Sequence, residues 1–237
     1  MNEITIVIPC YNEAHSLYNL LDQIKSLKIK CNFLLIDNGS TDETASILKN
    51  STLPKNVSYS TKKSNSGYGA GIKFGVKKVN TKLVGWMHGD LQQDLNVLSK
   101  IEKNLNILSK PGKKNLMAMK GLRTGRSIVE NIFTIGVSIT ASILFFKKCW
   151  DIAGQPNLYR KRDLYFLDDA PDDHNFEFYV YLKFKMLGGQ FFRFNAPFLK
   201  RRFGKSSWDN GILSKLVHSK NIFIYIFRLS FRRPHRR

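Results

Sequence analysis

Apolar and polar residues alternate through the first half of the chain with two different periods. Short, mainly apolar runs predict strands at residues 4–8, 33–36, 57–60 and 83–87. Segments with apolar residues three and four positions apart predict helices at residues 13–27, after the polar cap at 40–43, after the loop at 65–71, and at 95–108. Strands that alternate with helices in this way indicate an α/β fold, with a largely parallel sheet covered on both faces.

Polar residues follow three of the predicted strands at the point where each strand ends. They are residues 11–13 (Tyr-Asn-Glu), 37–39 (Asp-Asn-Gly) and 88–90 (His-Gly-Asp). In open parallel sheets, ligands bind outside the carboxyl ends of the strands. The sequence therefore predicts that one crevice collects all three segments.

The pattern changes after about residue 111. Residues 116–119 predict a short strand, and residues 128–146 are strongly apolar with basic residues on both sides. Residues 212–231 form a last apolar segment, which an arginine-rich tail follows. No linker, repeat or low-complexity stretch separates these parts. We expect a main domain and a C-terminal addition: 1–208, which includes an apolar interface-helix segment at about 126–148, and 209–237, an amphipathic helix with a basic tail.

The composition fits a globular protein in a reducing compartment. The chain has 237 residues, 43% of them hydrophobic, which suits one sizeable domain with a core. Its three cysteines, Cys10, Cys31 and Cys149, have no paired short spacing, which disfavours a disulfide framework or a zinc site. The apolar run at residues 4–8 stops at Pro9, so it predicts a first strand rather than a secretory leader.

The chain carries a large excess of positive charge. It has 38 lysines and arginines against 18 acidic residues, a formal net charge of +20. Such an excess favours an anionic partner: nucleic acid, an anionic membrane surface or a phosphorylated substrate. Charge alone does not choose among these. No nucleic-acid-binding motif is present and the strand ends carry carboxylates, so we expect no nucleic-acid partner.

Four motifs, in order along the chain, resemble those of one enzyme family. Residues 7–13 (Val-Ile-Pro-Cys-Tyr-Asn-Glu) resemble the opening motif of the family 2 glycosyltransferases, which have the GT-A fold. Residues 35–42 and 65–71 resemble the second and third motifs. Residues 88–92 (His-Gly-Asp-Leu-Gln) stand where the Asp-x-Asp metal motif of the family lies. The resemblance implies a mostly parallel central sheet flanked by helices, with apolar interface helices added.

Within this family, the chain most resembles the polyprenyl-phosphate glycosyltransferases of the dolichol-phosphate mannose synthase type. Residues 151–160 and 201–207 resemble two of their later segments, and the likeness covers roughly residues 4–208. It implies a hexosyltransferase that moves a sugar from a UDP- or GDP-sugar to a polyprenyl phosphate, with inversion at the anomeric carbon. The alternatives are transfer to a glycan or other non-lipid acceptor, and a degenerate member of the family without activity.

By this resemblance, residues of the first three motifs contact the nucleotide-sugar donor. They are Pro9, Tyr11, Glu13, Asp37, Gly67 and Gly69. The first three would contact the base and the ribose, Asp37 would bind the base, and the two glycines belong with Gly71 to a flexible loop near the donor. Asp42 either supports the turn after the second motif or caps the helix that follows.

A divalent cation, Mg²⁺ or Mn²⁺, would bridge the phosphates of the donor and stabilise the departing diphosphate. The resemblance makes Asp90 its first ligand, with Gln92 and His88 as further candidates. His88 departs from the family, which has aspartate at this position. Histidine ligates manganese and other transition ions, whereas magnesium prefers oxygen. His88 therefore ligates such an ion, hydrogen-bonds a phosphate, or simply ends the strand.

Asp90, Asp151 and Glu177 are the candidate catalytic residues. Asp151 and Glu177 stand where related enzymes have acidic residues on the acceptor side. A phosphate acceptor is already anionic and needs no strong general base, so Asp151 would orient groups rather than remove a proton. The alternative for Glu177 is an ordinary helix carboxylate.

Three basic residues near the end of the resemblance are expected to bind the phosphate of the acceptor. They are Arg201, Arg202 and Lys205. The guanidinium group offers a fork of donors that matches phosphate oxygens. The alternative is a basic run on the surface.

Residues 128–146 are close to the length that crosses a membrane, about 20 apolar residues. A single crossing would put Asp151 and Arg201 on the opposite side of the bilayer from Asp90 and would split the active site. We therefore expect peripheral helices that lie on the cytoplasmic face of the membrane, as in the enzymes that the chain resembles, rather than a soluble cytoplasmic protein. Residues 212–231 would form a second surface anchor, or alternatively a packed C-terminal helix.

Overall fold

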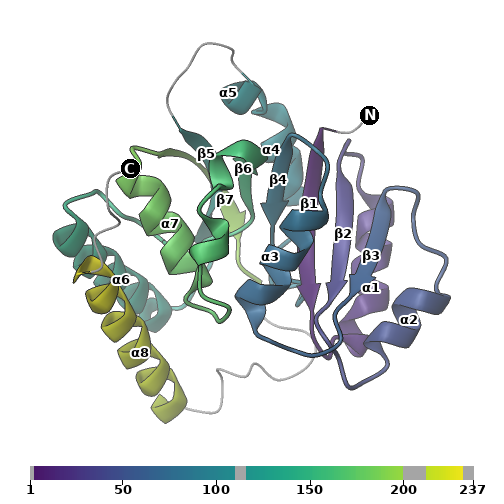
Figure 1. The fold of residues 1–237 in the computed structure, drawn as a ribbon, viewed down its shortest axis with the longest axis horizontal. Helices are drawn as coiled ribbons and strands as arrows, with labels where there is room; N and C mark the ends of the chain where they lie inside the picture. The colour runs from purple at the N-terminus through teal and green to yellow at the C-terminus, as the bar shows by residue number, and fades with distance from the viewer. Residues whose placement is uncertain (1–2, 110–115, 200–211, 232–237) are drawn as a thin grey trace.

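The computed structural model describes residues 3–109, 116–199 and 212–231. Within these residues, seven strands form one sheet in the order β3-β2-β1-β4-β6-β5-β7 (Figure 1). The strands are β1 (Ile4–Cys10), β2 (Asn32–Asp37), β3 (Val57–Thr61), β4 (Leu83–Trp86), β5 (Met117–Thr124), β6 (Asn157–Arg160) and β7 (Gln190–Pro197). Every neighbouring pair is parallel except that β6 is antiparallel to both β4 and β5. The predicted α/β class and the largely parallel sheet are confirmed.

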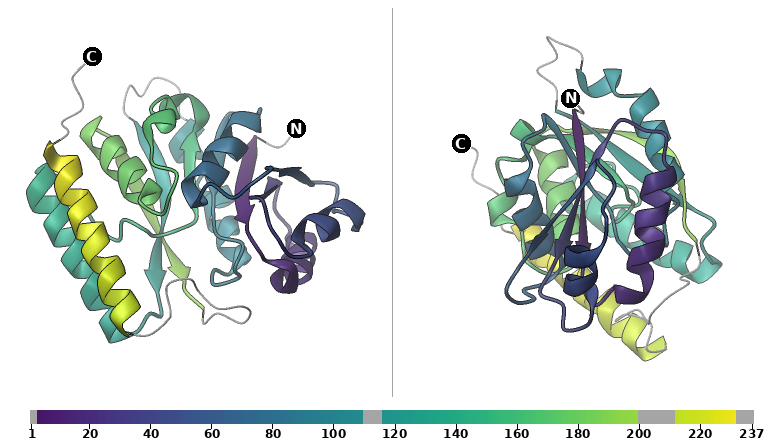
Figure 2. Two further views of the ribbon diagram at one scale, coloured as in Figure 1. Left: turned by 60° about the horizontal axis from the view of Figure 1, so that its bottom comes forward. Right: turned by 90° about the vertical axis from the view of Figure 1, so that its right-hand side faces the viewer.

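Helices cover both faces of this sheet (Figure 1 and Figure 2). They are α1 (Ala14–Ser26), α2 (Thr44–Asn50), α3 (Tyr68–Lys78), α4 (Leu98–Lys103), α5 (Asn106–Ser109), α6 (Ile128–Phe145), α7 (Phe176–Met186) and α8 (Ile212–Phe231). The side chains of β1 alternate between two cores. Ile4, Ile6 and Ile8 join the core under α1 and α4, and Val7 joins the core under α3 and α7. This period of two is what a strand buried on both faces requires.

Most elements predicted for the first half are confirmed. Strands β1 to β4 and helices α1 to α3 lie where the sequence pattern predicted them. The segment at 95–108 is not one helix, because a 3-10 turn (Leu95–Val97) precedes α4 and α5. The prediction of a flexible loop at 65–71 is also wrong in part. α3 begins at Tyr68, so Gly69 and Gly71 are buried in the start of a helix.

The second half contains three elements that the sequence pattern did not predict: β6, β7 and α7. β6 is only four residues long, and two of its buried residues, Asn157 and Arg160, are polar. β7 carries Arg193 and Asn195 among its aromatic residues. Both strands lack the run of apolar residues that marks β1, β2 and β4. Their pairing is decided by tertiary contacts rather than by local pattern.

The reversed direction of β6 determines what lies at the carboxyl edge of the sheet. Asn157, its first residue, pairs with Trp86 of β4 and with Lys120 of β5. The start of β6 therefore lies beside the ends of the parallel strands. Glycine makes room for the loop that enters it, because a Cβ at Gly121 would stand 2.1 Å from the carbonyl oxygen of Gln155. Residues just before β6 thus join the same edge as the strand-end motifs.

Helices α6 and α8 lie side by side at one end of the molecule (Figure 2). The rings of Phe133 and Phe223 meet edge to face between them, with centroids 6.1 Å apart, and side chains of α7 complete this core. The predicted helices at 128–146 and 212–231 are confirmed. Among the described residues, α6 alone is long and apolar enough by length and composition to cross a membrane, and only 17% of it is buried.

Candidate functional site

The end of β2 forms a hydrogen-bonded turn at the carboxyl edge. Asp37 is buried, and its Oδ1 accepts a hydrogen bond of 2.9 Å from the backbone N–H of Ser40. The side-chain amide of Asn38 donates to the carbonyl oxygen of Gly67 over 2.9 Å, which ties the turn to the start of α3. Gly39 supplies the positive φ of 74° that the turn requires. Asp37 is thus held at the predicted edge, and its contact with a base stays a prediction.

Asp42 connects the first turns of two helices. Its Oδ2 accepts a hydrogen bond from the backbone N–H of Ala14, and its Oδ1 accepts one from that of Thr44. Burial raises the pKa of Asp42, but the hydrogen bonds from Thr44 and Ala14 outweigh it and hold the pKa below its ordinary value. The geometry therefore gives Asp42 a capping role for α1 and α2.

The predicted donor residues after β1 differ in how they are held. Pro9 is partly buried beside Gly71 of α3, at a distance of 3.2 Å from the place of a Cβ there. The carboxylate of Glu13 accepts a hydrogen bond of 2.6 Å from the hydroxyl of Ser16. Tyr11 is an exposed aromatic side chain. Of these three, Tyr11 is the most open to a planar ligand, and all three donor contacts stay predictions.

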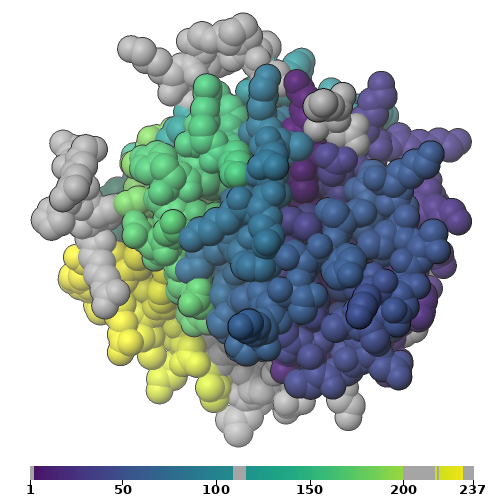
Figure 3. Space-filling view, turned by 45° about the vertical axis from the view of Figure 1, so that its right-hand side comes forward, coloured from purple at the N-terminus to yellow at the C-terminus, as the bar shows by residue number. Residues whose placement is uncertain are grey.

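The glycines at the start of α3 permit close packing against the segment that precedes α7. A Cβ at Gly67, whose φ is +103°, would stand 2.4 Å from the carbonyl oxygen of Asp172, and one at Gly69 would stand 2.4 Å from that of Pro171. The backbone N–H of Ala70 donates to the Asp172 oxygen as well. Figure 3 shows α3 and the green segment in contact on this face of the molecule. Packing thus accounts for both glycines, and their donor contact stays a prediction.

His88, Asp90 and Gln92 lie in the turn after β4. Oδ1 of Asp90 accepts a hydrogen bond of 3.1 Å from the backbone N–H of Gln92. The imidazole ring of His88 stacks on the ring of Tyr68 in α3, with centroids 4.7 Å apart and planes inclined by 25°. The position that carries aspartate in the family therefore has an aromatic contact in this chain.

These three side chains would give a metal ion a mixed donor set of carboxylate oxygen, amide oxygen and imidazole nitrogen. Such a set suits Mn²⁺ better than Mg²⁺. No three His, Cys, Asp or Glu side chains among residues 3–109, 116–199 and 212–231 gather as a metal site. The described residues therefore form no closed protein cage for a metal, and metal binding by Asp90, His88 and Gln92 stays a prediction.

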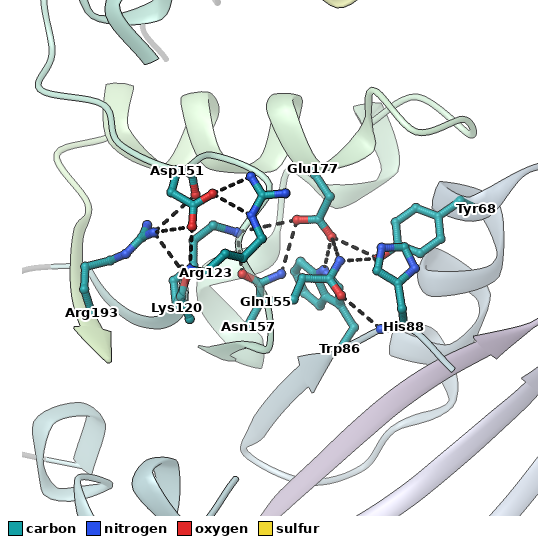
Figure 4. Close-up of polar contacts among 11 residues, drawn as sticks. Tyr68, Trp86, His88, Lys120, Arg123, Asp151, Gln155, Asn157, Glu177 and Arg193 are labelled. Carbon is teal, nitrogen blue, oxygen red and sulfur yellow. Dashed lines mark hydrogen bonds and ion pairs between the residues drawn. The ribbon is translucent and has the colours of Figure 1, made fainter. Parts of the chain in front are cut away.

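Glu177 of α7 lies at the centre of a buried hydrogen-bond network (Figure 4). Its Oε1 accepts hydrogen bonds from three side chains: Trp86 Nε1 (2.7 Å), Gln155 Nε2 (2.8 Å) and the Tyr68 hydroxyl (3.1 Å). Its Oε2 accepts one of 3.2 Å from Asn157 and lies 3.6 Å from the ammonium group of Lys120. Because both oxygens are engaged, Glu177 is suited to hold its neighbours in place, and its catalytic role stays a prediction.

Lys120 is a fully buried cation in the middle of β5. Its ammonium group donates a hydrogen bond of 2.5 Å to the side-chain oxygen of Asn157 and lies over the ring of Tyr181. Burial lowers the pKa of Lys120 to about 8, and the charge of Glu177 offsets part of this effect. The lysine therefore keeps its charge at neutral pH mainly through its pairing with the network.

Asp151 is buried and forms a second ion cluster with two partly buried arginines (Figure 4). Its Oδ1 accepts hydrogen bonds from Nε (2.7 Å) and Nη2 of Arg123, and its Oδ2 accepts one of 2.8 Å from the Arg123 backbone. Arg193 approaches the same carboxylate, with its Nη2 3.7 Å from Oδ2. Burial raises the pKa of Asp151, but Arg123 outweighs it and holds the pKa below its ordinary value. The carboxylate of Asp151 thus holds Arg123 and Arg193, and its catalytic role stays a prediction.

The structure brings together several residues that the sequence did not mark as functional. Tyr68, Lys120 and Gln155 stand in the Glu177 network, and Arg123 and Arg193 stand beside Asp151. One signal could have found Lys120, which is a charged residue directly after the apolar run Leu-Met-Ala-Met at 116–119. Gln155 lies within residues 151–160, which resemble a segment of the family. It was missed because ligand-binding residues were sought only after the ends of parallel strands, whereas Gln155 precedes the antiparallel strand β6.

The predicted phosphate ligands Arg201, Arg202 and Lys205 lie outside the described residues. Their role stays a prediction.

Replacement of Asp151 by asparagine is expected to destabilise the protein by about 3 kcal/mol, because two partly buried arginines would lose their buried counter-ion. Asp168→Asn is the matched control, since that carboxylate pairs with Lys77 at the surface with side chains 71% and 66% exposed. It should change the free energy of unfolding by less than about 0.5 kcal/mol. Urea unfolding of both variants measures this.

The pH dependence of stability gives a further check on the ion pair between Asp151 and Arg123. The folded pKa of Asp151 lies below the value of 3.8 for an unperturbed group. Its contribution to stability is therefore complete above that value and is lost as pH falls through the lower folded pKa. The stability difference between the parent protein and Asp151→Asn should shrink on acidification, and a difference that stays constant would contradict the assignment.

Comparison with known proteins gives a consistent result. Residues 5–108 match the family model described as glycosyl transferase family 2. A dolichyl-phosphate beta-glucosyltransferase of Dictyostelium discoideum is 28% identical over 165 residues, which are 61% of this chain and 50% of that protein. An uncharacterised glycosyltransferase of Rickettsia typhi is 28% identical over 124 residues, 50% of this chain. The chain spans about a third and a half of the lengths of these two relatives (36% and 50%).

Two solved structures share the fold. A mannosyltransferase from Pyrobaculum calidifontis, in complex with GDP-Man and Mn²⁺, has a TM-score of 0.66 at 15% identity and covers 97% of this chain and 64% of its own. TarS (residues 1–349) of S. aureus, in complex with UDP-GlcNAc, has a TM-score of 0.58 at 15% identity, over 95% of this chain and 71% of its own. The match to the glycosyl transferase family 2 model thus covers the first part of the chain, residues 5–108, and the fold is the GT-A fold of these glycosyltransferase structures.

Proposed function

We propose that this chain transfers a sugar, with inversion, from a nucleoside diphosphate sugar to the phosphate of a polyprenyl-phosphate lipid at the cytoplasmic face of a membrane. One observation carries the proposal. The turn with His88 and Asp90 is hydrogen-bonded through Gln155 and Glu177 to the buried cation Lys120, at the carboxyl edge of the sheet. A transferase needs both: a place for the diphosphate and a place for the acceptor.

The donor side of the proposal rests on the first three motifs. Tyr11 is exposed for contact with a base, and Asp37 lies at the neighbouring strand end to accept hydrogen bonds from base or ribose. The two structural neighbours bind GDP-Man and UDP-GlcNAc, so the comparison supports a nucleotide sugar and leaves both purine and pyrimidine open. The assay below identifies the sugar and the base of the donor.

A divalent cation is part of the proposed donor site. Asp90 would hold it, with His88 and Gln92 as further candidates, and it would stabilise the negative charge of the departing diphosphate. The Pyrobaculum calidifontis neighbour contains Mn²⁺ with its GDP-Man. We expect manganese rather than magnesium here, because histidine replaces a carboxylate at the first position of the motif.

The acceptor side of the proposal rests on the cations near the end of β5. Lys120, Arg123 and Arg193 are balanced by only two carboxylates, those of Asp151 and Glu177. This excess of one positive charge favours an anionic ligand. The Dictyostelium discoideum relative is named for dolichyl phosphate, which supports a lipid phosphate as that anion. A phosphate oxygen is already a nucleophile, so no strong base is required.

Arg126 extends the positive region towards the membrane-facing helix. It stands just before α6, lies over the ring of Phe198, and has a buried Nε without a hydrogen-bond partner. Its remaining contacts are a hydrogen bond to Thr134 and an ion pair of 3.8 Å with Glu130. A cation at the start of an apolar helix is well placed for the head group of a lipid.

The exposed apolar face of α6 and α8 supports the membrane location. Ile132, Ile139 and Ile143 of α6 are 64%, 53% and 66% exposed, and their spacing places them on one side of the helix. Phe227 of α8 is also exposed. Large apolar faces of this kind mark interaction surfaces, and a helix that lies in the interface buries such a face among the lipid head groups.

Incubation with UDP- or GDP-sugars, a short polyprenyl phosphate and Mn²⁺ or Mg²⁺ should yield a glycolipid with one donor. We expect more product with Mn²⁺, loss of product on chelation, and a fall of at least about a hundredfold in turnover for Asp90→Ala, because the charge of the leaving group is no longer neutralised. Thin-layer chromatography of a radiolabelled sugar measures the product.

Asp168→Ala, on the surface, is the control for this assay. Donor hydrolysis without glycolipid would retain the transferase and move the acceptor to a glycan or another non-lipid molecule. Absence of nucleotide-sugar binding in calorimetry would contradict the proposed activity and favour a degenerate family member.

Combined replacement of Ile132, Ile139 and Ile143 by serine should weaken binding to vesicles that contain anionic lipid by about a hundredfold. Each partly inserted isoleucine contributes about 1 kcal/mol through burial of apolar area. Replacement of the exposed Tyr18, Tyr59 and Tyr165 by serine is the control and should leave binding unchanged. Vesicle co-sedimentation measures both, and equal binding by the two triple variants would contradict the membrane location.

A further inference from the structure

A side chain outside the strand-end motifs, that of Gln155, holds the backbone of the turn after β4. The backbone N–H of His88 donates a hydrogen bond of 3.0 Å to Oε1 of Gln155, the residue just before Pro156 and β6 (Figure 4). This bond crosses from the donor side of the site to the reversed strand. The two residues that it joins are 67 positions apart in the sequence.

The amide of Gln155 is held in one orientation. The residue is fully buried, and its Nε2 donates to the Tyr68 hydroxyl over 2.6 Å and to Oε1 of Glu177 over 2.8 Å. Both of these partners can accept, whereas the His88 N–H can only donate. Rotation of the amide by 180° would set its NH₂ group against that N–H and its oxygen against the carboxylate. The network therefore fixes which end of the amide faces the turn.

Glu177 connects Gln155 to the cations of the acceptor side. Its Oε2 pairs with Lys120, which lies three residues before Arg123 on β5. Arg123 in turn holds Asp151. A continuous series of contacts thus runs from the backbone of His88 to Lys120 through the buried side chains of Gln155 and Glu177. The charges of Arg193, Asp151 and Arg123 also act on Lys120.

We propose that Gln155 is a positioning residue that sets the place of the His88–Asp90 turn relative to the Glu177–Lys120 ion pair. By doing so, it sets the distance between the diphosphate of the donor and the cations of the acceptor side. The inference deepens the proposed function and rests on it for its catalytic consequence. Its structural part, the hold of Gln155 on the turn, stands on the hydrogen bonds alone.

Gln155→Met tests this with a side chain of similar length that makes none of the three hydrogen bonds. We expect affinity for the nucleoside diphosphate, probed with UDP and GDP in Mn²⁺, to change less than about threefold, because the base and ribose contacts lie elsewhere. Turnover should fall by about a hundredfold, because a displacement of about 1 Å at the reacting groups has an effect of this size. Calorimetry and the glycolipid assay measure the two quantities.

Trp86→Phe is the matched control. It removes a different hydrogen bond to the same oxygen, Oε1 of Glu177, from another buried residue, and leaves the bond between Gln155 and His88 intact. It should lower the unfolding midpoint in denaturant while the backbone amide of His88 keeps its protection from hydrogen exchange. An equal loss of His88 protection in Trp86→Phe and Gln155→Met would assign the effect to general damage of the network and would overturn the proposal.

Hydrogen exchange separates this inference from the proposed function, since it needs no substrate. In the parent protein, the backbone amide of His88 should be strongly protected, although it lies beyond the end of β4. In Gln155→Met, protection at this amide should fall by at least about tenfold while the amides of β4 and β1 keep theirs. Unchanged protection of His88 would overturn the positioning role. If Gln155→Met loses protection at the His88 amide but the parent protein transfers no sugar, the positioning role of Gln155 is retained and the proposed function is rejected.

Discussion

Two buried carboxylates, one buried lysine and two partly buried arginines gather at the carboxyl edge of the sheet, and much of the site depends on how they pair with one another. Removal of a charge from water costs several kcal/mol per ion unless the charge is paired and its remaining hydrogen-bonding capacity is used. Glu177 meets this requirement with four hydrogen bonds and one cation, and Asp151 meets it with two arginines. The constraint requires α7, β5 and the start of β6 to meet at one place.

The same constraint explains the unusual features around the site. β6 runs against its neighbours, which brings Asn157 and Gln155 to the edge where Glu177 needs donors. Gly121 has no side chain because the loop before β6 passes too close for one. The stacking of His88 on Tyr68, whose hydroxyl reaches Glu177, joins the metal-motif turn to the same centre. A site for donor and acceptor can then be held rigidly by groups that touch neither ligand.

The sequence predicts the elements that local pattern determines. Asp37 and Asp90 were found because each follows an apolar strand, and the edge of a parallel sheet collects such residues. Asp151 and Glu177 were identified by resemblance, but their partners were not. Lys120 and Gln155 act through the antiparallel register of β6, which is a non-local pairing without a periodic signature. Local pattern also failed at 65–71, where Gly69 belongs to a helix because it packs against Pro171, a residue 102 positions away.

The central claim is that Glu177 and Lys120 form one buried unit, and a double-mutant cycle tests it most directly. Unfolding free energies of Glu177→Gln, Lys120→Met and the double variant should show that each single change costs about 3 kcal/mol, since each leaves a buried charge without its partner. The double variant should be more stable than the sum of the singles predicts, by about 1–3 kcal/mol. Strict additivity would contradict the account, because the two charges would then not depend on each other.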